Sequence, residues 1–189
     1  MCIKTDSENN IHISYMTSPW PPTSLIYLKN TTGSWSSEVV TQCYQSSSFD
    51  LDTSDYAHFS YYDLGLGGLM YRTNSPDGIW KDAVAVESNW QGGQMESLIT
   101  DIAVDLESKP HISYVGAKES VWTEDTKYAY KTDGQWYDTI IDNGESAGSF
   151  NSIATEINNK AHLAYYHRSS GEIRYTTNSE GTWETHMLD

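Results

Sequence analysis

The chain has 189 residues, enough for one ordinary domain with its own core or for several small units that share one. Its 26 acidic and 11 basic side chains give a formal net charge of −15, which repels nucleic-acid phosphates and anionic membrane surfaces. No stretch is as long and apolar as a membrane-spanning helix, so we expect neither a nucleic acid nor a membrane as partner.

The first residues add little about location. The opening ten residues have neither the basic start nor the apolar centre of a signal peptide. Cys2 and Cys43 allow at most one disulfide, and their spacing matches no metal motif. We therefore expect two ordinary thiols, and the compartment is not fixed by them.

One short motif, with a histidine followed three residues later by a tyrosine, recurs four times along the chain. Its copies place His12, His58, His111 and His162 at intervals of 46, 53 and 51 residues. An acid stands six residues before each histidine: Asp6, Asp52, Asp105 and Glu156. A second tyrosine and then a tryptophan follow each copy: Tyr27 and Trp35, Tyr71 and Trp80, Tyr128 and Trp136, Tyr175 and Trp183. Periods of this length indicate a repeat architecture.

Each repeat contains four short runs of β-branched and aromatic residues, separated by turn residues such as Asn9-Asn10 and Asp77-Gly78. No segment has sustained helical spacing of apolar residues, so we expect essentially no helix. A small four-stranded sheet cannot bury both faces alone, and repetition lets each sheet cover the next. We predict one all-β domain over 1–189, a β-propeller of four four-stranded antiparallel blades at 2–40, 48–86, 101–142 and 152–189.

The repeats also carry a family likeness. The pattern S-I-A-x-D, H-I-S-Y and L-x-Y-x-T-N-x-x-G-x-W resembles the repeats of sialidase-like (BNR, Asp-box) β-propellers over nearly the whole chain. The segment 75–80, Ser-Pro-Asp-Gly-Ile-Trp, is a shortened form of that family's S-x-D-x-G-x-x-W box. The resemblance implies the propeller fold and favours an extracellular or cell-surface location. Such propellers include hydrolases, lyases, lectins and scaffolds, so the resemblance carries no activity by itself.

Four whole blades leave no strand over with which to complete a shared blade. An open arc would expose the apolar outer faces of the first and last blades, and such a patch is an association site. We predict that two chains pair head to tail as a homodimer, giving a two-fold, eight-bladed ring. A self-closed four-bladed ring and a fragment of a longer protein are the alternatives.

Residues that recur in every blade are expected to serve the blade. Zinc needs its ligands about 2 Å from one point, whereas the four histidines would be spread around a ring. We expect each histidine to satisfy buried polar groups, together with the acid six residues before it or a nearby serine or tryptophan. We expect no metal or other cofactor, and we assign the repeated tyrosines and tryptophans to the core.

Three tryptophans, Trp20, Trp90 and Trp122, fall outside the repeat in loops expected on one face of the propeller. That face, which we call the loop face, holds the connections between the second and third strands and between blades. The tryptophans either form platforms for sugar rings or anchor loops and interfaces. For the first interpretation the candidate ligand-binding residues are Trp20, Trp90, Trp122, Tyr44, Glu124, His167 and Arg168.

The sequence favours a non-catalytic binding or scaffolding propeller whose partners are a second copy of itself and a glycan. The alternative is a glycan-cleaving enzyme of the sialidase-like type, either a glycoside hydrolase or a polysaccharide lyase. A sialidase would bring three arginines to bind the substrate carboxylate, and the arginines of the chain are Arg72, Arg168 and Arg174. We expect Arg72 and Arg174, which lie in third strands, to face solvent as part of the scaffold, so they would not form such a triad. No catalytic residue is assigned.

Overall fold

A computed structural model describes the chain except residues 19–22, 64, 66–67, 88–98, 118–123 and 145–147. The described residues form four antiparallel sheets of four strands, each in simple up-and-down order, and no helix. None of these residues therefore belongs to a helix that could cross a membrane. Blade 1 comprises β1 (Cys2–Thr5), β2 (Ile11–Met16), β3 (Thr23–Lys29) and β4 (Ser36–Cys43), and blade 2 comprises β5 (Gln45–Leu51), β6 (Ala57–Asp63), β7 (Gly68–Thr73) and β8 (Val84–Glu87). Blade 3 comprises β9 (Thr100–Val104), β10 (Pro110–Ala117), β11 (Glu124–Thr132) and β12 (Gln135–Asp142), and blade 4 comprises β13 (Ser149–Thr155), β14 (Ala161–His167), β15 (Glu172–Thr177) and β16 (Glu184–Met187).

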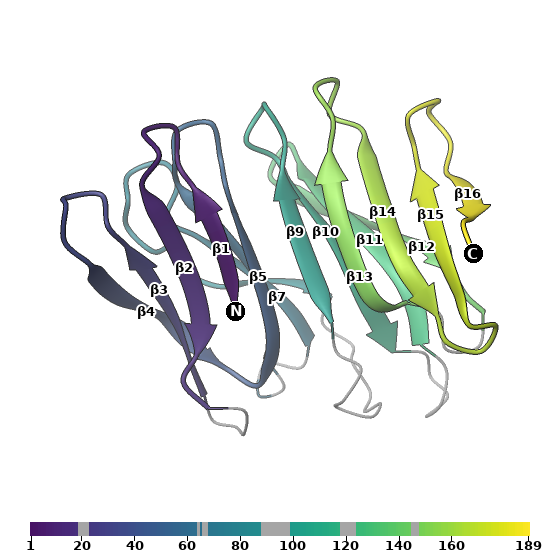
Figure 1. The fold of residues 1–189 in the computed structure, drawn as a ribbon, viewed down its shortest axis with the longest axis horizontal. Coiled ribbons are helices and arrows are strands. Elements are labelled where there is room, and N and C mark those ends of the chain that lie inside the picture. Colours follow the sequence, from purple (N-terminus) through teal and green to yellow (C-terminus); the bar gives the residue numbers. More distant parts are fainter. Residues whose placement is uncertain (19–22, 64, 66–67, 88–98, 118–123, 145–147) are drawn as a thin grey trace.

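The four sheets stand side by side in an open row, as Figure 1 shows. Their first strands, β1, β5, β9 and β13, are neighbours along the row. Blades 1 and 4 occupy opposite ends of the longest axis and do not meet. The hairpin turns β1–β2 and β13–β14 lie at the upper edge in Figure 1, on what we call the turn face, and the loop face is opposite. The predicted all-β fold of four four-stranded blades is confirmed.

The turn after the first strand of each blade has one backbone geometry. Its fourth residue adopts a left-handed conformation, with φ of 65°, 64°, 60° and 63° at Asn9, Asp55, Ser108 and Asn159. Asn and Asp tolerate this region better than most residues. In blades 1 to 3 the acid that opens the turn accepts two backbone N–H bonds; those to Asp52 come from Ser54 and Tyr56, at 2.9 and 3.0 Å. A carboxylate thus shapes each of these three turns.

In blades 1 to 3 the second carboxylate oxygen of the acid binds the repeated histidine. Asp52 Oδ2 lies 3.1 Å from His58 Nε2, and His58 Nδ1 lies 2.7 Å from the Tyr71 hydroxyl. Because the carboxylate can only accept, the Nε2–H donates to it and the tyrosine O–H donates to Nδ1. The same Asp–His–Tyr chain recurs in blades 1 and 3. The histidines therefore join turns to third strands, with tyrosine as a partner that sequence reasoning did not name.

Blade 4 has a weaker form of this chain. His162 keeps its tyrosine, with Nδ1 2.6 Å from the Tyr175 hydroxyl. Its acid is Glu156, whose carboxylate stands 3.8 Å from His162 Nε2, too far for a hydrogen bond. Both side chains are also more exposed, at 28% and 34%, against 3% and 2% for His58 and Asp52.

Consecutive blades are joined by a tryptophan from one blade that meets the repeated tyrosine of the blade before it. Trp80, Trp136 and Trp183 contact Tyr27, Tyr71 and Tyr128 edge to face, with ring centroids 5.8, 5.1 and 4.8 Å apart. Edge-to-face pairs at such distances are favourable beyond the area that they bury. Three apolar clusters accompany these pairs, one at each seam between blades.

Two arginines also lie at these seams, which corrects the expectation that Arg72 and Arg174 face solvent. Arg72 of blade 2 donates to the carbonyls of Lys81 and of Val40 in blade 1. Arg174 of blade 4 donates to Asp142 of blade 3 at 2.6 Å. A third strand packed on a neighbouring blade leaves polar groups at that neighbour's edge, and the long arginine side chain reaches them.

Candidate functional site

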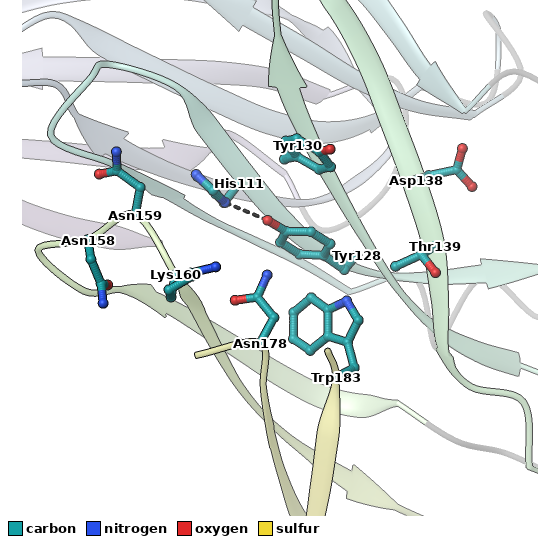
Figure 2. Close-up of a pocket in the computed structure, with 10 residues that line it drawn as sticks. All are labelled: His111, Tyr128, Tyr130, Asp138, Thr139, Asn158, Asn159, Lys160, Asn178 and Trp183. Atoms are coloured by element: carbon teal, nitrogen blue, oxygen red, sulfur yellow. Dashed lines mark hydrogen bonds between the residues drawn. The ribbon is translucent and has the colours of Figure 1, made fainter. Parts of the chain in front are cut away.

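A groove of about 360 Å³ opens on the turn face between blades 3 and 4. Figure 2 shows its ten lining residues, which come from β10, β11 and β12 of blade 3 and from the β13–β14 and β15–β16 turns of blade 4. They are His111, Tyr128, Tyr130, Asp138, Thr139, Asn158, Asn159, Lys160, Asn178 and Trp183. The volume is at the lower end of the range for small-molecule sites.

Aromatic rings form one wall of this groove. Tyr128 and Tyr130 lie on the same face of β11, with ring centroids 5.8 Å apart and planes inclined by 21°. Trp183 meets Tyr128 edge to face from blade 4. Beneath them, His111 Nδ1 is 2.6 Å from the Tyr128 hydroxyl. Burial lowers the pKa of His111, although Asp105 opposes this, so the imidazole is neutral near pH 7 and orients Tyr128 without adding charge.

Polar groups border the aromatic wall. Asp138 and Thr139 come from β12, and Asn158 and Lys160 come from the first turn of blade 4. Asn178 follows β15, and its side-chain oxygen accepts from the Ala161 N–H at 2.8 Å. Figure 2 shows the Asn178 nitrogen on the side of Tyr128. The groove therefore combines ring faces with an amide, a carboxylate, a hydroxyl and an ammonium group.

A second groove, of about 270 Å³, occupies the same position between blades 2 and 3. His58 and Tyr71 replace His111 and Tyr128 there, and Lys109 replaces Lys160. Two differences close its aromatic wall: Thr73 stands where blade 3 has Tyr130, and the Lys131 ammonium lies 5.4 Å from the Tyr71 ring centroid. The groove between blades 3 and 4 thus has one more aromatic ring in its wall, the partly exposed Tyr130.

Sequence reasoning assigned the groove's aromatic residues to the scaffold and missed this site. A signal was present two residues after the repeated tyrosine of the third strand. The residues there are Lys29, Thr73, Tyr130 and Thr177, so only blade 3 has an aromatic side chain. Tyr130, a departure from the repeat inside a strand, indicated the site, whereas candidate binding residues were sought only in the loops.

On the loop face, the structure builds a polar cluster at the seam of blades 3 and 4. Asp142 accepts from the Tyr165 hydroxyl at 2.8 Å and from Arg174, which also donates to Glu172 at 2.7 Å. Burial alone would raise the pKa of Asp142, but the bonds from the Gly144 N–H, Tyr165 and Arg174 outweigh burial and lower it. Both carboxylates are therefore ionised, and the single guanidinium of Arg174 offsets one of their two negative charges.

The predicted loop-face residues are placed as follows. His167 ends β14, is buried, and its Nδ1 lies 2.7 Å from the Ser170 hydroxyl beside the polar cluster. Arg168, next to it, is exposed, and the backbone of Glu124 opens β11. Tyr44 lies between β4 and β5, two seams away from His167, so the structure does not bring these two together. Trp20, Trp90 and Trp122 and the side chain of Glu124 lie outside the described residues.

Comparison with known proteins shows the fold. No family model and no curated protein sequence matches the chain. Solved structures do: Aleuria aurantia lectin in complex with α-methyl-L-fucoside superposes with a TM-score of 0.64 at 11% identity, over 95% of this chain and 56% of the lectin. An α-L-arabinofuranosidase from Fusarium graminearum gives a TM-score of 0.64 at 12% identity, over 98% of this chain and 65% of the enzyme.

A polysaccharide lyase, an ulvan lyase, matches with a TM-score of 0.55 at 9% identity, over 99% of this chain and 53% of the lyase. The chain thus spans little more than half to two thirds of the length of these structures. At such low identity the likeness establishes a propeller-type fold.

Proposed function

We propose that the protein is a non-catalytic, carbohydrate-binding β-propeller, and that the groove between blades 3 and 4 is a sugar site. The observation that carries this proposal is the aromatic wall of the groove, in which the partly exposed ring of Tyr130 stands beside the buried Tyr128 and is bordered by Asp138, Lys160 and Asn178. A sugar ring presents C–H groups on one side and hydroxyls around its edge, which matches a ring face bordered by short polar side chains.

The charge of the protein favours a neutral sugar. The net charge of −15 opposes an anionic ligand, and within the groove Asp138 and Lys160 offset each other. The lectin among the structural neighbours carries α-methyl-L-fucoside, a neutral glycoside. Methyl glycosides of neutral sugars, that one included, are therefore the first probes.

The arrangement of carboxylates supports binding over hydrolysis. Glycoside hydrolysis generally takes two carboxyl groups facing each other across the bond. Among the described residues lining the groove, Asp138 is the only carboxylate. On the loop face, Arg174 keeps Asp142 and Glu172 ionised. An ionised carboxylate has no proton to give and is unsuited to the role of general acid. A glycan-cleaving enzyme stays the alternative, and the release of reducing ends or unsaturated sugars would identify it.

The loop face stays a second candidate surface. Its proposed ligand-binding residues are Trp20, Trp90, Trp122, Tyr44, Glu124, His167 and Arg168. The polar cluster beside His167 supports this proposal, because it fixes several hydrogen-bonding groups on a rigid seam.

We further propose that 1–189 acts as a single domain, that its repeats are degenerate sialidase-like (Asp-box) repeats, and that it works at the cell surface or outside the cell. The shortened box at 75–80 supports the repeat identity. Completion of the ring by a second copy is also proposed.

A glycan array followed by calorimetry with the best methyl glycoside tests the sugar-binding proposal. We expect binding without turnover, weakened in Tyr130→Thr, which installs the residue of the blade 2 repeat. Thr73→Val, at the equivalent position of the other groove, is the matched control and should leave binding unchanged. Full binding by Tyr130→Thr would move the site away from this groove.

A further inference from the structure

The two ends of the row expose the two halves of one repeated interface. Within the chain, the leading face of each blade packs on the trailing face of the blade before it. Leading-face residues of blade 2, such as Phe49 and Tyr61, are fully buried. Blade 1 has apolar residues at the same positions, Ile3 and Tyr15, which are 63% and 37% exposed. Blade 1 thus keeps the interface sequence without a partner.

The trailing face of blade 4 shows the complementary half. Its surface has an apolar hollow of about 420 Å³, lined by Phe150, Ser152, Ala164, Tyr165, Tyr166 and Ile173. Ile173 is 43% exposed, whereas the residues at its position in blades 1 and 2, Leu25 and Leu69, are buried. The hollow therefore lies where the other blades receive a leading face.

The tryptophan–tyrosine pairs give the same result. Three pairs join the four blades, and a fourth tryptophan and a fourth tyrosine are left without each other. Trp35 of blade 1 is 52% exposed, and Tyr175 of blade 4 stacks on His186 of its own blade, with centroids 6.1 Å apart. The unused members lie on the two terminal blades.

We propose that a second copy of this chain covers both faces, so that each chain's blade 1 packs on the other chain's blade 4. Because the chain carries both halves of the interface, two copies related by a two-fold axis satisfy all four faces. A blade face that meets water normally carries polar residues, whereas the outer faces of blades 1 and 4 carry exposed apolar side chains. The three seams inside the chain already pair a leading face with a trailing face, and a second copy offers the same two faces to blades 1 and 4.

The closing seam also completes a site. At the seam of blades 3 and 4 the groove needs the histidine and tyrosine of one blade and the tryptophan and first turn of the next. At the closing seam these would be His162 and Tyr175 of one chain and Trp35 and Asn10 of the other. A further groove at the equivalent position is therefore built from both chains, with Thr177 where the groove between blades 3 and 4 has Tyr130. That it takes a sugar rests on the proposed function, whereas the pairing of chains does not.

Light scattering coupled to size exclusion tests the pairing without any ligand. We expect a mass about twice the 21.3 kDa of one chain. Ile3→Asp and Ile173→Asp each place a charge in both seams of a homodimer, so each should weaken pairing by about 100-fold, tenfold for each seam, and elute as one chain. Ile157→Asp, at an 84% exposed turn position, is the control and should stay paired.

Mixing the two variants is the decisive step. In a mixed pair, the intact blade 1 of Ile173→Asp meets the intact blade 4 of Ile3→Asp, so one seam is restored and the two-chain mass should partly return. Circular dichroism of each variant checks the fold, and Tyr15→Lys with Phe150→Lys provides a second pair. A one-chain mass for the unaltered protein would overturn the proposal. So would a mass that keeps growing with concentration, or pairing that only one variant loses.

Discussion

The Asp–His–Tyr chain should stabilise blades unequally, and matched substitutions measure the difference. Asp52 accepts four hydrogen bonds, from the Ser54 and Tyr56 N–H groups, His58 Nε2 and the Ser75 hydroxyl. Asp52→Asn replaces the accepting oxygen beside His58 by an N–H donor, so a buried imidazole N–H loses its partner. A hydrogen bond to a charged group contributes about 1.5–3 kcal/mol, and we expect a loss of about 2–3 kcal/mol in the free energy of unfolding.

Glu156→Gln is the matched change in blade 4. Its carboxylate is 3.8 Å from His162 and 34% exposed, so the expected loss is at most about 0.5 kcal/mol. Urea unfolding at pH 7, followed by circular dichroism, compares the two variants. Equal losses would refute the assignment of the turn carboxylate as a structural acceptor.

The same comparison has a pH dependence. Burial acts to raise the pKa of Asp52, but the bonds from His58 and the turn N–H groups lower it to about 2. A carboxylate with a depressed folded-state pKa stabilises the fold above its unfolded value near 4, and this stability is lost as the pH falls from about 4 to 2. After allowance for screening, the ionisation of Asp52 contributes about 1–2 kcal/mol to the difference in the free energy of unfolding between the unaltered protein and Asp52→Asn. This difference should therefore shrink as the pH falls over that range. A gap that is constant with pH would contradict the ionised role.

Three further predictions concern the groove and the seam between blades 3 and 4. Tyr130→Thr should weaken sugar binding by about 3- to 10-fold in calorimetry, the value of one aromatic contact, and should also lower the melting temperature because Tyr130 packs on His111 and Tyr137, while circular dichroism shows that the fold is kept. Arg174→Met leaves Asp142 and Glu172 without their cation, and urea unfolding should show that the free energy of unfolding falls by about 1–2 kcal/mol. An unchanged free energy of unfolding would show that the ion pair does not stabilise the seam. Gly148 has φ of +98°, and a Cβ there would stand 3.2 Å from the Thr126 Cα, so Gly148→Ala should lower the melting temperature; an unchanged value would contradict the close approach of Gly148 to Thr126 of β11.

The repeat made the fold predictable, because each blade must bury the same positions to pack on its neighbour. The spacing of His58, Tyr71 and Trp80 indicated strands two, three and the turn before strand four, and the structure has them there. The acid six residues before the histidine was also named in advance, and it binds the histidine in three blades. The tyrosine partner was missed because it comes from the next strand, at a register that spacing alone does not give.

Blade 3 shows why departures from a repeat matter. In the other blades an asparagine after the third strand accepts from the first N–H of the second strand, as Asn74 does from Ala57 at 2.7 Å. Blade 3 has Pro110 at that N–H position, so no donor exists, and Lys131 replaces the asparagine. Lys131 then lies over Tyr71 and fills one groove, whereas Asn178 leaves the other open. The site thus arises from residues that differ from the repeat, and a search for the common pattern does not detect them.

The most direct test of the account is to observe which tryptophan responds to sugar. Each of the seven tryptophans gives one indole N–H signal in a ¹⁵N–¹H spectrum, and the Trp183→Phe variant assigns that of Trp183. On titration with the methyl glycoside selected by the array, we predict a saturable shift of the Trp183 signal, which in Tyr130→Thr saturates only at about 3- to 10-fold higher sugar concentration. Saturable shifts confined to Trp20, Trp90 or Trp122, with Trp183 unmoved, would contradict this prediction and place the sugar on the loop face.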